Sequence, residues 1–342
     1  MTGPWLLLGA VALSGSLTPL VLRYAVRRAL LDVPTPRSSH TRPTPRGGGL
    51  AIAAAIVVTV CLGCLAGLIP GRACTALVGG AVAVALVGWL DDLAHVPAPV
   101  RAMVHFGAAV WAVAWLGGMP VLAVGAGAVR LGWPGAALAV VGVVWLVNLY
   151  NFMDGIDGLA AAEALIVGAT ASVLLMLRGD GGLALVAGLV GSASAGFLFW
   201  NWAPARIFMG DVGSGMLGFA FGVLAVAGER SGSLPALAWV TLLAVFVVDA
   251  TVTLVRRVAR GERWYLAHRS HAYQRLVQSG WSHAQVVAGA SAVNIALAGA
   301  AWWGLRTGAS GAVCLGTLVA VGVLYAAVER KRPMASASAD TR

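Results

Sequence analysis

The sequence predicts an all-α integral membrane protein, a polytopic bundle of about eleven transmembrane helices. Of its 342 residues, 59% are hydrophobic and only 11% are charged, which is far more apolar than a soluble domain requires. Apolar runs long enough to cross a hydrocarbon core of roughly 30 Å recur along the whole chain. The expected spans are residues 4–24, 49–69, 73–90, 103–119, 134–150, 159–177, 182–199, 213–228, 236–256, 285–304 and 310–327.

Basic residues predict how this bundle is oriented. An odd number of spans places the termini on opposite sides, and Lys and Arg accumulate in cytoplasmic loops. Under alternating threading one side receives only Arg72, Arg130, Arg178, Arg230 and Arg306. The other side receives Arg23, Arg27, Arg28, Arg37, Arg42, Arg46, Arg101, Arg206, Arg256, Arg257, Arg260, Arg263, Arg269, Arg275, Arg330, Lys331, Arg332 and Arg342. We therefore expect a periplasmic amino terminus and a cytoplasmic carboxyl terminus.

We expect one transmembrane domain over residues 1–332 and a disordered tail over 333–342. The first span has no convincing cleavage site and is interpreted as a retained helix rather than a signal peptide. Cys61 and Cys64 lie inside an apolar helix, so packing explains them better than a metal or redox site. The net charge of +10 is spread over short loops instead of one continuous face, which argues against a nucleic-acid partner.

Carboxylates gather at three ends of the predicted spans. The chain has only thirteen Asp and Glu residues, and five of them, Asp91, Asp92, Asp154, Asp157 and Asp211, lie at these ends. Acidic side chains beside a membrane are costly and more often mark a site than decorate a loop. The threading places all three ends on the cytoplasmic side, although the acids were not used to derive it. The sequence therefore predicts a polar site at the cytoplasmic face.

The first two motifs are an adjacent pair of acids and a segment that combines acids with Asn and Gly. Asp91 and Asp92 are adjacent on a helix and project about 100° apart, so one could hold a cation while the other faces a substrate; a solvated helix end is the alternative. In the segment NLYNFMDGIDGL, residues 148–159, Asn148, Asn151 and two acids alternate with glycines. Asp154 and Asp157 would share one face if this turn were helical.

The third motif, NWAPARIFMGDVGSG at residues 201–215, leads into a predicted helix. Asp211 followed by Gly, Ser and Gly offers a hard metal ligand beside free backbone N–H groups and a positive helix end. This chemistry suits a diphosphate bound through a divalent cation. Phe208 could stack on a base, or it could simply anchor the helix at the membrane interface.

Two loops add basic groups to the same side. In the loop 257–284, His268, Arg269 and His271 could bind phosphate oxygens or a sugar, although a generic basic loop is the alternative. In the first loop, His40 and Arg46 precede three glycines that would let the second span begin close to a ligand or a neighbouring helix.

Asp249 is unusual because it lies within the ninth predicted span. A bare carboxylate would be costly there. We expect Arg256, Arg257 or a bound ligand to neutralise it.

Taken together, these motifs resemble the polyprenyl-phosphate N-acetylhexosamine-1-phosphate transferases, glycosyltransferase family 4. This family includes phospho-N-acetylmuramoyl-pentapeptide transferase and the enzymes that initiate O-antigen and enterobacterial common antigen. The most specific matches are NxxNFMDGIDGL at 148–159 and IFMGDVGS at 207–214, and the resemblance covers nearly the whole chain.

The resemblance implies a reaction in a bacterial inner membrane. A UDP-N-acetyl sugar would be the donor, undecaprenyl phosphate the acceptor and Mg²⁺ the cofactor, with Mn²⁺ as a substitute; UMP would be released at the cytoplasmic face. A homodimer is left open. Direct attack by the lipid phosphate is favoured over a covalent phosphoryl intermediate.

The resemblance also assigns residues. It implies Asp211 and Asp91 as metal ligands, and Phe208 as the platform for uracil. The catalytic candidates are Asp91, Asp92, Asp154 and Asp157, with the choice of base between the first two left open. The candidates for substrate binding are Asn148, Asn151, Phe208, His268, Arg269, His271, Arg46 and His40.

The loop sequence HRSHAYQRL, residues 268–276, departs from the run of histidines in the muramoyl-pentapeptide branch and is similar to the O-antigen-initiating branch. The latter acts on UDP-N-acetylhexosamines or their 6-deoxy forms, and the muramoyl-pentapeptide transferase stays the alternative. A secondary transporter would place its acids near mid-membrane and carry inverted repeats. A non-catalytic scaffold would not explain why acids, Asn and Gly converge on one face.

Overall fold

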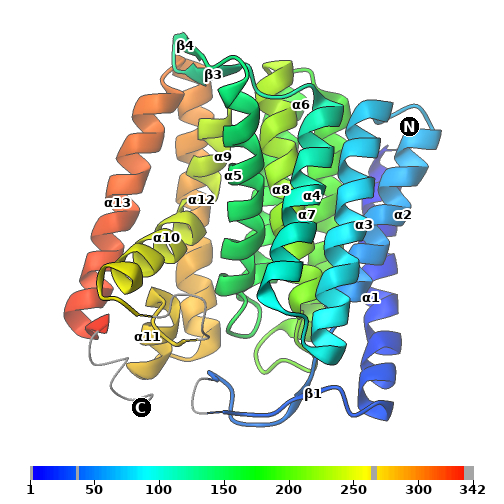
Figure 1. Cartoon of the computed structure of the whole chain (residues 1–342), viewed down its shortest axis with the longest axis vertical. Helices are drawn as coiled ribbons and strands as arrows, with labels where there is room; N and C mark the ends of the chain where they lie inside the picture. Colours follow the sequence, from blue (N-terminus) through cyan, green and yellow to red (C-terminus); the bar gives the residue numbers. More distant parts are fainter. Residues whose placement is uncertain (1–2, 36–37, 263–267, 335–342) are drawn as a thin grey trace.

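The computed structural model describes residues 3–35, 38–262 and 268–334, which form a helical bundle with two small antiparallel sheets (Figure 1). The helices are α1 (Gly3–Arg27), α2 (Gly49–Leu65), α3 (Gly71–Ala94), α4 (Ala98–Leu116), α5 (Pro134–Met153), α6 (Leu159–Leu177), α7 (Gly181–Asn201), α8 (Asp211–Ser231), α9 (Ala236–Leu242), α10 (Ala244–Ala259), α11 (Ala272–Gln278), α12 (His283–Thr307) and α13 (Ser310–Lys331). The strands are β1 (Leu31–Asp32), β2 (Thr44–Pro45), β3 (Val121–Val124) and β4 (Gly127–Arg130), paired as β1–β2 and β3–β4.

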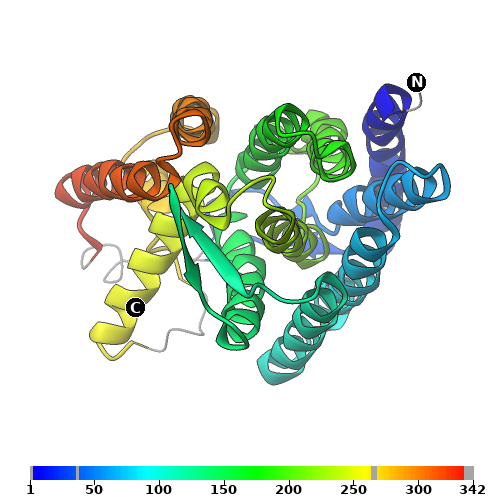
Figure 2. The same cartoon turned by 90° about the horizontal axis from the view of Figure 1, so that it is seen from above.

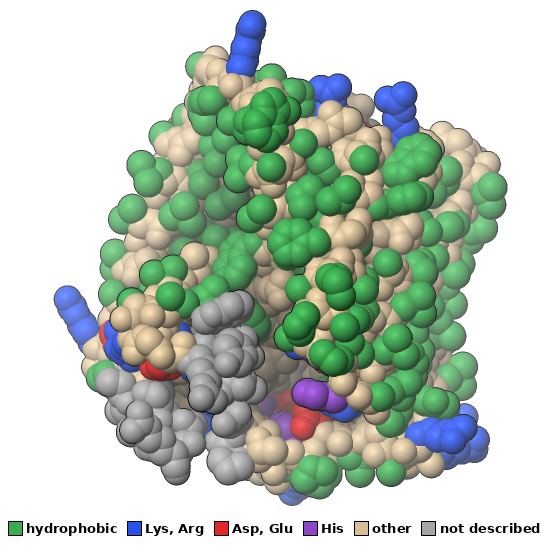
Figure 3. Space-filling model, in the orientation of Figure 1, with side chains coloured by type: hydrophobic (Ala, Val, Ile, Leu, Met, Phe, Trp, Pro, Cys, Tyr) green, Lys and Arg blue, Asp and Glu red, His purple; other side chains and the backbone are tan. Residues whose placement is uncertain are grey.

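The predicted fold class is confirmed. Each of the eleven expected spans coincides with a helix or, for residues 236–256, with a pair of helices. Within the described residues, nine helices are long and apolar enough to cross a membrane, and α2 is a shorter apolar helix of 17 residues. Figure 3 shows hydrophobic side chains over the middle of the visible surface and Lys and Arg side chains at its ends. The protein is a multi-pass membrane protein.

The ninth predicted span is wrong as a single helix. Its two halves, α9 and α10, meet at an angle of 83°, and α10 runs obliquely away from the upright helices (Figure 1). Residues 236–256 contain no Gly or Pro that would predict a break. Instead, α10 is bent toward α11, with which the polar side of α10 shares hydrogen bonds, so a tertiary contact outweighs the local helical preference.

The two ends of the bundle differ. The chain starts at the upper end in Figure 1, together with the β3–β4 hairpin, whereas β1, α11 and the end of α13 lie at the lower end. This arrangement fits an odd number of crossings. Which end faces the cytoplasm stays a prediction from the basic residues. Arg37, Arg263 and the tail from residue 335 lie outside the described residues.

Small residues set the distances between helices in the bundle. Helix α8 is the most enclosed span, and it packs against α2, α3, α5 and α7 in the interior (Figure 2). A Cβ atom on Gly191 of α7 would lie 3.1 Å from the backbone of Ala169 in α6, and one on Gly196 would lie 2.3 Å from Val11 O in α1. Apolar side chains alone give little drive for association in lipid, so such close backbone contacts hold these helices together.

A close backbone approach also occurs where α2 and α8 begin. The N–H groups of Gly48 and Gly49 donate to the carbonyl oxygens of Phe208 and Met209, and the N–H of Phe208 donates to Pro45 O. The first loop is therefore paired along its backbone with the segment that leads into α8. The glycines at 47–49 allow the close approach to a neighbouring helix that the sequence predicts.

We expect Gly49→Ala to lower the free energy of unfolding by about 2 kcal/mol or more, because the new methyl would lie 2.3 Å from the Cα of Gly213. Gly107→Ala in α4 is the matched control, since a Cβ atom there meets no atom within 4 Å. It should be neutral or stabilising by up to about 1 kcal/mol. Thermal unfolding in detergent measures both, and equal melting temperatures would contradict the packing described for α2 and α8.

Candidate active site

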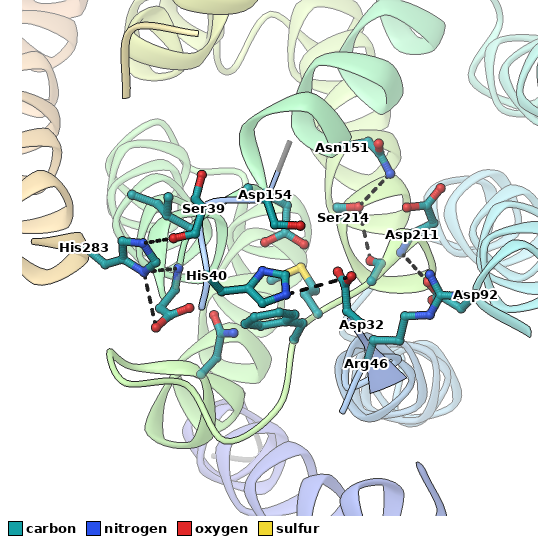
Figure 4. Close-up of a pocket in the computed structure, with 18 of the residues that line it drawn as sticks. Asp32, Ser39, His40, Arg46, Asp92, Asn151, Asp154, Asp211, Ser214 and His283 are labelled. Carbon is teal, nitrogen blue, oxygen red and sulfur yellow. Dashed lines mark hydrogen bonds and ion pairs between the residues drawn. The ribbon is translucent and has the colours of Figure 1, made fainter. Parts of the chain in front are cut away.

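A polar pocket of about 290 Å³ opens at the lower end of the bundle (Figure 4). Its walls come from the first loop, the ends of α3 and α5, the start of α8, and single residues of α11 and α12. In Figure 3 acidic and His side chains are visible together in a hollow at this end. The lining residues are Asp32, Thr35, Ser38, Ser39, His40, Arg46, Asp92, Asn151, Asp154, Gly155, Ile156, Asp157, Asn201, Phe208, Met209, Gly210, Asp211, Ser214, Gln274 and His283.

The pocket collects most of the residues singled out in the sequence. Those that line it are Asp92, Asp154, Asp157, Asp211, Asn151, Phe208, Arg46 and His40. Those that do not are Asp91, Asn148, His268, Arg269 and His271. The predicted convergence of acids from three span ends is therefore present in the structure. The roles of the individual residues stay predictions.

Asp92 joins the end of α3 to the start of α8. Its carboxylate accepts the backbone N–H groups of Asp211 at 3.2 Å and Val212 at 3.4 Å. The expectation of free N–H groups next to Asp211 was therefore wrong: the helix begins at Asp211 itself, and a neighbouring carboxylate caps its positive end. Gly210 has φ +75°, and a Cβ atom there would lie 2.5 Å from the Asp92 carboxylate, so the chain requires glycine.

Asp91 is not among the lining residues, and its carboxylate is bound by groups of α4 and the turn before it. Its Oδ1 accepts the N–H of Val96 at 2.6 Å. Its Oδ2 accepts a hydrogen bond from Arg101 Nη1 at 2.6 Å, and the same nitrogen donates to Asp211 Oδ2 at 2.9 Å. Sequence reasoning counted Arg101 only as a charge that orients the chain. Its position in the first turn of α4, the helix that follows the Asp-Asp pair, was the available signal.

The oxygen groups around Asp211 fit a magnesium site. Mg²⁺ usually takes one or two carboxylates from the protein and completes its shell with water and substrate phosphates. Asp91 and Asp211 present two carboxylate oxygens to one point, where a guanidinium nitrogen stands. Asn151 donates to the Ser214 hydroxyl at 3.2 Å on the adjoining wall. Within the described residues no three His, Cys, Asp or Glu side chains form a ready metal cluster, so the protein would supply only part of the shell.

Asp154 and Asp157 occupy a turn that is not helical, so they do not share a helix face; both nevertheless line the pocket. Enclosure by the pocket wall, together with the nearby acids, raises the pKa of Asp154 well above its ordinary value. Enclosure also acts to raise the pKa of Asp157, but hydrogen bonds with His283 and the Ala205 N–H bring it below the ordinary value. The two acids therefore favour opposite protonation states.

Two residues that sequence reasoning missed fix this turn in place. His283, the first residue of α12, has its Nδ1 3.3 Å from the Asp157 carboxylate and its Nε2 3.2 Å from Ser39 O in the first loop. Asn201 accepts the N–H of Gly158 and donates to Ile207 O. Asn201 opens the third motif and His283 falls in the loop 257–284, but nothing in either segment predicts a contact with the turn. His283 is more than 120 residues away from Asp157 in the chain.

Phe208 lies between the polar pocket and a second cavity of about 770 Å³, whose walls include Arg42 and Arg206. The ring edge of His40 packs against Phe208, with ring centroids 4.9 Å apart and planes at 67°. The aromatic residue is thus placed at the pocket wall rather than in lipid.

Asp249 is not neutralised by Arg256 or Arg257, which contact Glu329 and Glu262 respectively. Its buried carboxylate accepts the N–H groups of Ala272 and Tyr273 at the start of α11 and lies 3.3 Å from His271 Nδ1. The backbone donors are available because α11 begins there and needs acceptors for its first N–H groups.

The other predicted binding residues outside the pocket also have partners in the fold. Asp249 holds His271, which is 3% exposed, in the interior. Asn148 donates to Val144 O within its own helix, and Arg269 donates to Ser38 O. The Nδ1 of His268 accepts the N–H of Ser270. All four residues therefore have structural roles, and their predicted roles in substrate binding stay predictions.

An apolar cavity of about 380 Å³ lies between α10, α11, α12 and α13. Its walls include Met153, which directly precedes Asp154, and Tyr273, whose hydroxyl donates to Phe152 O. Most of the remaining lining is aliphatic, among it Val248, Leu276, Val293 and Val321. The apolar cavity and the polar pocket are therefore lined by adjacent residues, Met153 and Asp154.

Comparison with known proteins places the chain in a family. The model of glycosyl transferase family 4 matches residues 74–229. A probable undecaprenyl-phosphate N-acetylglucosaminyl 1-phosphate transferase of Bacillus subtilis is 34% identical over 272 residues, which cover 78% of this chain and 75% of the relative. The chain belongs to glycosyl transferase family 4. The resemblance noted from the sequence motifs is thereby confirmed.

Other members of family 4 match over most of their length. The phospho-N-acetylmuramoyl-pentapeptide-transferase of Synechococcus sp. (strain JA-3-3Ab) is 33% identical and covers 86% of this chain and 90% of the relative. The decaprenyl-phosphate N-acetylglucosaminephosphotransferase of Mycolicibacterium smegmatis is 29% identical and covers 84% and 80%. The matched family-4 region runs from α3 to α8 and holds all five acids of the three motifs.

His268 gives a prediction for the pH dependence of stability. Burial, with the nearby His271 and Arg257, lowers the pKa of His268 from 6.5 to about 3. Between pH 6.5 and pH 3 the unfolded chain therefore binds a proton at His268 and the folded chain does not. The free energy of unfolding is highest above pH 6.5 as far as His268 is concerned, and it decreases as the pH falls toward 3. His268→Gln should abolish the loss, which is about 1 kcal/mol at pH 5 for a half-buried group.

The measurement is the melting temperature from pH 7.5 to pH 5. The exposed Thr307, which does not titrate, is the control, and Thr307→Ser should leave the slope of the wild-type protein unchanged. An identical slope for His268→Gln and the wild type would contradict the burial of a neutral imidazole at this position.

Proposed function

We propose that this family-4 protein transfers an N-acetylhexosamine-1-phosphate from a UDP-sugar to undecaprenyl phosphate, with release of UMP. The observation that carries the proposal is the convergence of Asp92, Asp154, Asp157 and Asp211 in one polar pocket that adjoins an apolar cavity. A polar pocket suits a nucleotide diphosphate, and an apolar cavity suits a prenyl chain. The names of three relatives support the general reaction, since each is a transferase acting on a polyprenyl phosphate or on a phospho-N-acetylmuramoyl group.

The reaction would take place at the cytoplasmic face of the bacterial inner membrane. The polar pocket lies at the end of the bundle where α1 ends and α11 begins, which is also the end that carries most of the basic residues. Because Lys and Arg accumulate on the cytoplasmic side, this end is the one expected to meet a soluble nucleotide-sugar.

The donor would lie along the wall formed by the first loop and the segment before α8. Phe208 offers an aromatic face for uracil if His40 moves aside. Arg46 offers positive charge to the diphosphate, since its buried Nε meets no hydrogen-bond acceptor within the described residues. Asn151 and Asp157 would bind the polar groups of the nucleotide or the sugar.

Asp211 would hold Mg²⁺ together with Asp91, and Mn²⁺ is expected to substitute. When bound, the ion neutralises negative charge on the diphosphate and so lowers the barrier to attack by a second anion. The donor set fits this role because both residues present hard carboxylate oxygens and leave positions for phosphate oxygens.

The chemical step proposed is direct attack. An oxygen of the lipid phosphate attacks the sugar-bearing phosphorus of the donor, a new diphosphate bond forms, the bond to the α-phosphate breaks and UMP leaves. Asp92 is the better placed of the two adjacent acids to accept a proton from the lipid phosphate, because it lines the pocket and Asp91 does not. Protonated Asp154 could donate a hydrogen bond to a phosphate oxygen.

The sugar is proposed to be an N-acetylhexosamine or its 6-deoxy form, and the product to initiate a lipid-linked glycan such as O-antigen. The sequence HRSHAYQRL at the start of α11 supports this branch over the muramoyl-pentapeptide branch. Its His271 is oriented by Asp249 instead of projecting into the pocket, so this loop would act by shaping the site.

Purified protein with Mg²⁺ and undecaprenyl phosphate should release UMP from at least one member of a panel of UDP-N-acetyl sugars that includes the muramoyl-pentapeptide donor. Asp211→Asn should lower the rate at least about 100-fold, because it removes a charged metal ligand. Asp180→Asn is the matched control, since Asp180 caps α7 outside the pocket and should leave the rate unchanged. No UMP from any donor would overturn the proposed reaction.

Direct attack predicts that the protein retains no label when incubated with donor labelled in the β-phosphate and no acceptor. If Asp92 is the base, Asp92→Asn should flatten the acidic limb of the pH profile of kcat, whereas Asp91→Asn, which removes a proposed metal ligand, should keep that limb and raise the Mg²⁺ concentration required for half-maximal rate. Accumulation of labelled phosphoprotein, detected after acid quenching, would replace direct attack by a covalent intermediate. Loss of the acidic limb in Asp91→Asn instead of Asp92→Asn would move the base to Asp91.

A further inference from the structure

One nitrogen of Arg101 stands where two carboxylates of the proposed metal site converge. Arg101 Nη1 lies 2.6 Å from Asp91 Oδ2 and 2.9 Å from Asp211 Oδ2. Arginine commonly meets a single carboxylate with two of its nitrogens. Here one guanidinium nitrogen donates to two carboxylates that come from different helices, α3 and α8. This is the arrangement that a bound metal ion would also make.

The three partners differ in their freedom to move. The Asp91 side chain is 9% exposed, and its second oxygen is held by the Val96 N–H. The side chains of Arg101 and Asp211 are 32% and 30% exposed. Within the described residues the Arg101 guanidinium makes no further hydrogen bond, and arginine has a long, flexible stem. Of the three groups, Arg101 is therefore the one that can leave.

We propose that Arg101 is an exchangeable counter-ion, which holds Asp91 and Asp211 together until a divalent cation takes its place between them. The proposal rests on the proposed function, because that function assigns the cation to these two acids. Two carboxylates this close repel one another unless a positive charge lies between them. A guanidinium and a metal ion cannot use the same oxygen lone pairs at once, so they must compete. Arg101 would thereby keep the site assembled without metal and set its affinity for the ion.

Mn²⁺ binding to the purified protein tests this without any substrate. We expect Arg101→Met to bind Mn²⁺ at least about tenfold more tightly than the wild type, as measured by calorimetry or by the electron paramagnetic resonance of free Mn²⁺. Arg46→Met is the matched control, since it removes one positive charge next to Asp92 but leaves the two shared oxygens as they are. Its effect should be clearly smaller. Arg101→Lys, which retains the charge, should bind Mn²⁺ with an affinity closer to that of the wild type.

Stability gives a second measurement. In EDTA, Arg101→Met should melt at a lower temperature than the wild type, because two carboxylates are left facing each other, and saturating Mn²⁺ should remove the difference. Unchanged or weaker Mn²⁺ binding by Arg101→Met, an effect no larger than that of Arg46→Met, or a deficit in melting temperature that Mn²⁺ does not correct would each overturn the proposal. Arg101 would then be a permanent structural ion pair.

These outcomes are separate from those of the transferase assay. If no donor yields UMP while Arg101→Met still tightens Mn²⁺ binding, the reaction is wrong and the exchange stands. If UMP is released in a Mg²⁺-dependent reaction while Mn²⁺ affinity is indifferent to Arg101, the reaction stands and the exchange is wrong.

Discussion

The hydrogen bonds from the start of α8 to Asp92 determine how the site is assembled. A helix end leaves its first N–H groups without partners inside the helix, and those of Asp211 and Val212 at the start of α8 need acceptors. The Asp92 carboxylate supplies the acceptor, so the end of α3 must lie against the start of α8. Asp211 is the first residue of that helix, and the same contact therefore fixes its position relative to Asp91. Three acids from two helices are brought together by one capping requirement.

The first loop depends on the same junction. Its backbone pairs with residues 208 and 209, immediately before α8, and the glycines at 48 and 49 leave room for that pairing. His40 and Arg46 line the pocket. The strand β2 between them pairs with β1, and its Pro45 O accepts the N–H of Phe208. The turn at 154–158 is tied to the segment before α8 by Asn201 and to α12 by His283. The end of α3, the first loop and the turn at 154–158 are thus all connected to the start of α8 or to the segment before it, and α12 is connected through the turn.

Much of this could be predicted from sequence, because membranes impose strong rules. Spans such as 159–177 are predictable since every backbone polar group in lipid must be bonded within a helix. The acids at 91, 92, 154, 157 and 211 stand out because so few charges occur elsewhere. What could not be predicted depends on contacts across the bundle. The helix breaks at Leu243 without a Gly or Pro, so the local sequence does not predict the break. Its physical reason is the hydrogen bonds between Asp249 and α11. Arg101 and His283 looked like ordinary loop residues until their partners in other segments were known.

Under the proposed function, the bend between α9 and α10 would also affect how the lipid substrate arrives. Because α10 slants away from the upright helices, the apolar cavity beside it is bounded by a tilted wall instead of a closed ring of spans. A long-chain lipid could then enter from the side by diffusing in the plane of the bilayer, while a nucleotide enters from water. The two reactants would search in two and three dimensions respectively. The encounter rate of the lipid would depend on the amount of lipid per unit of membrane area, and that of the nucleotide on its concentration in solution.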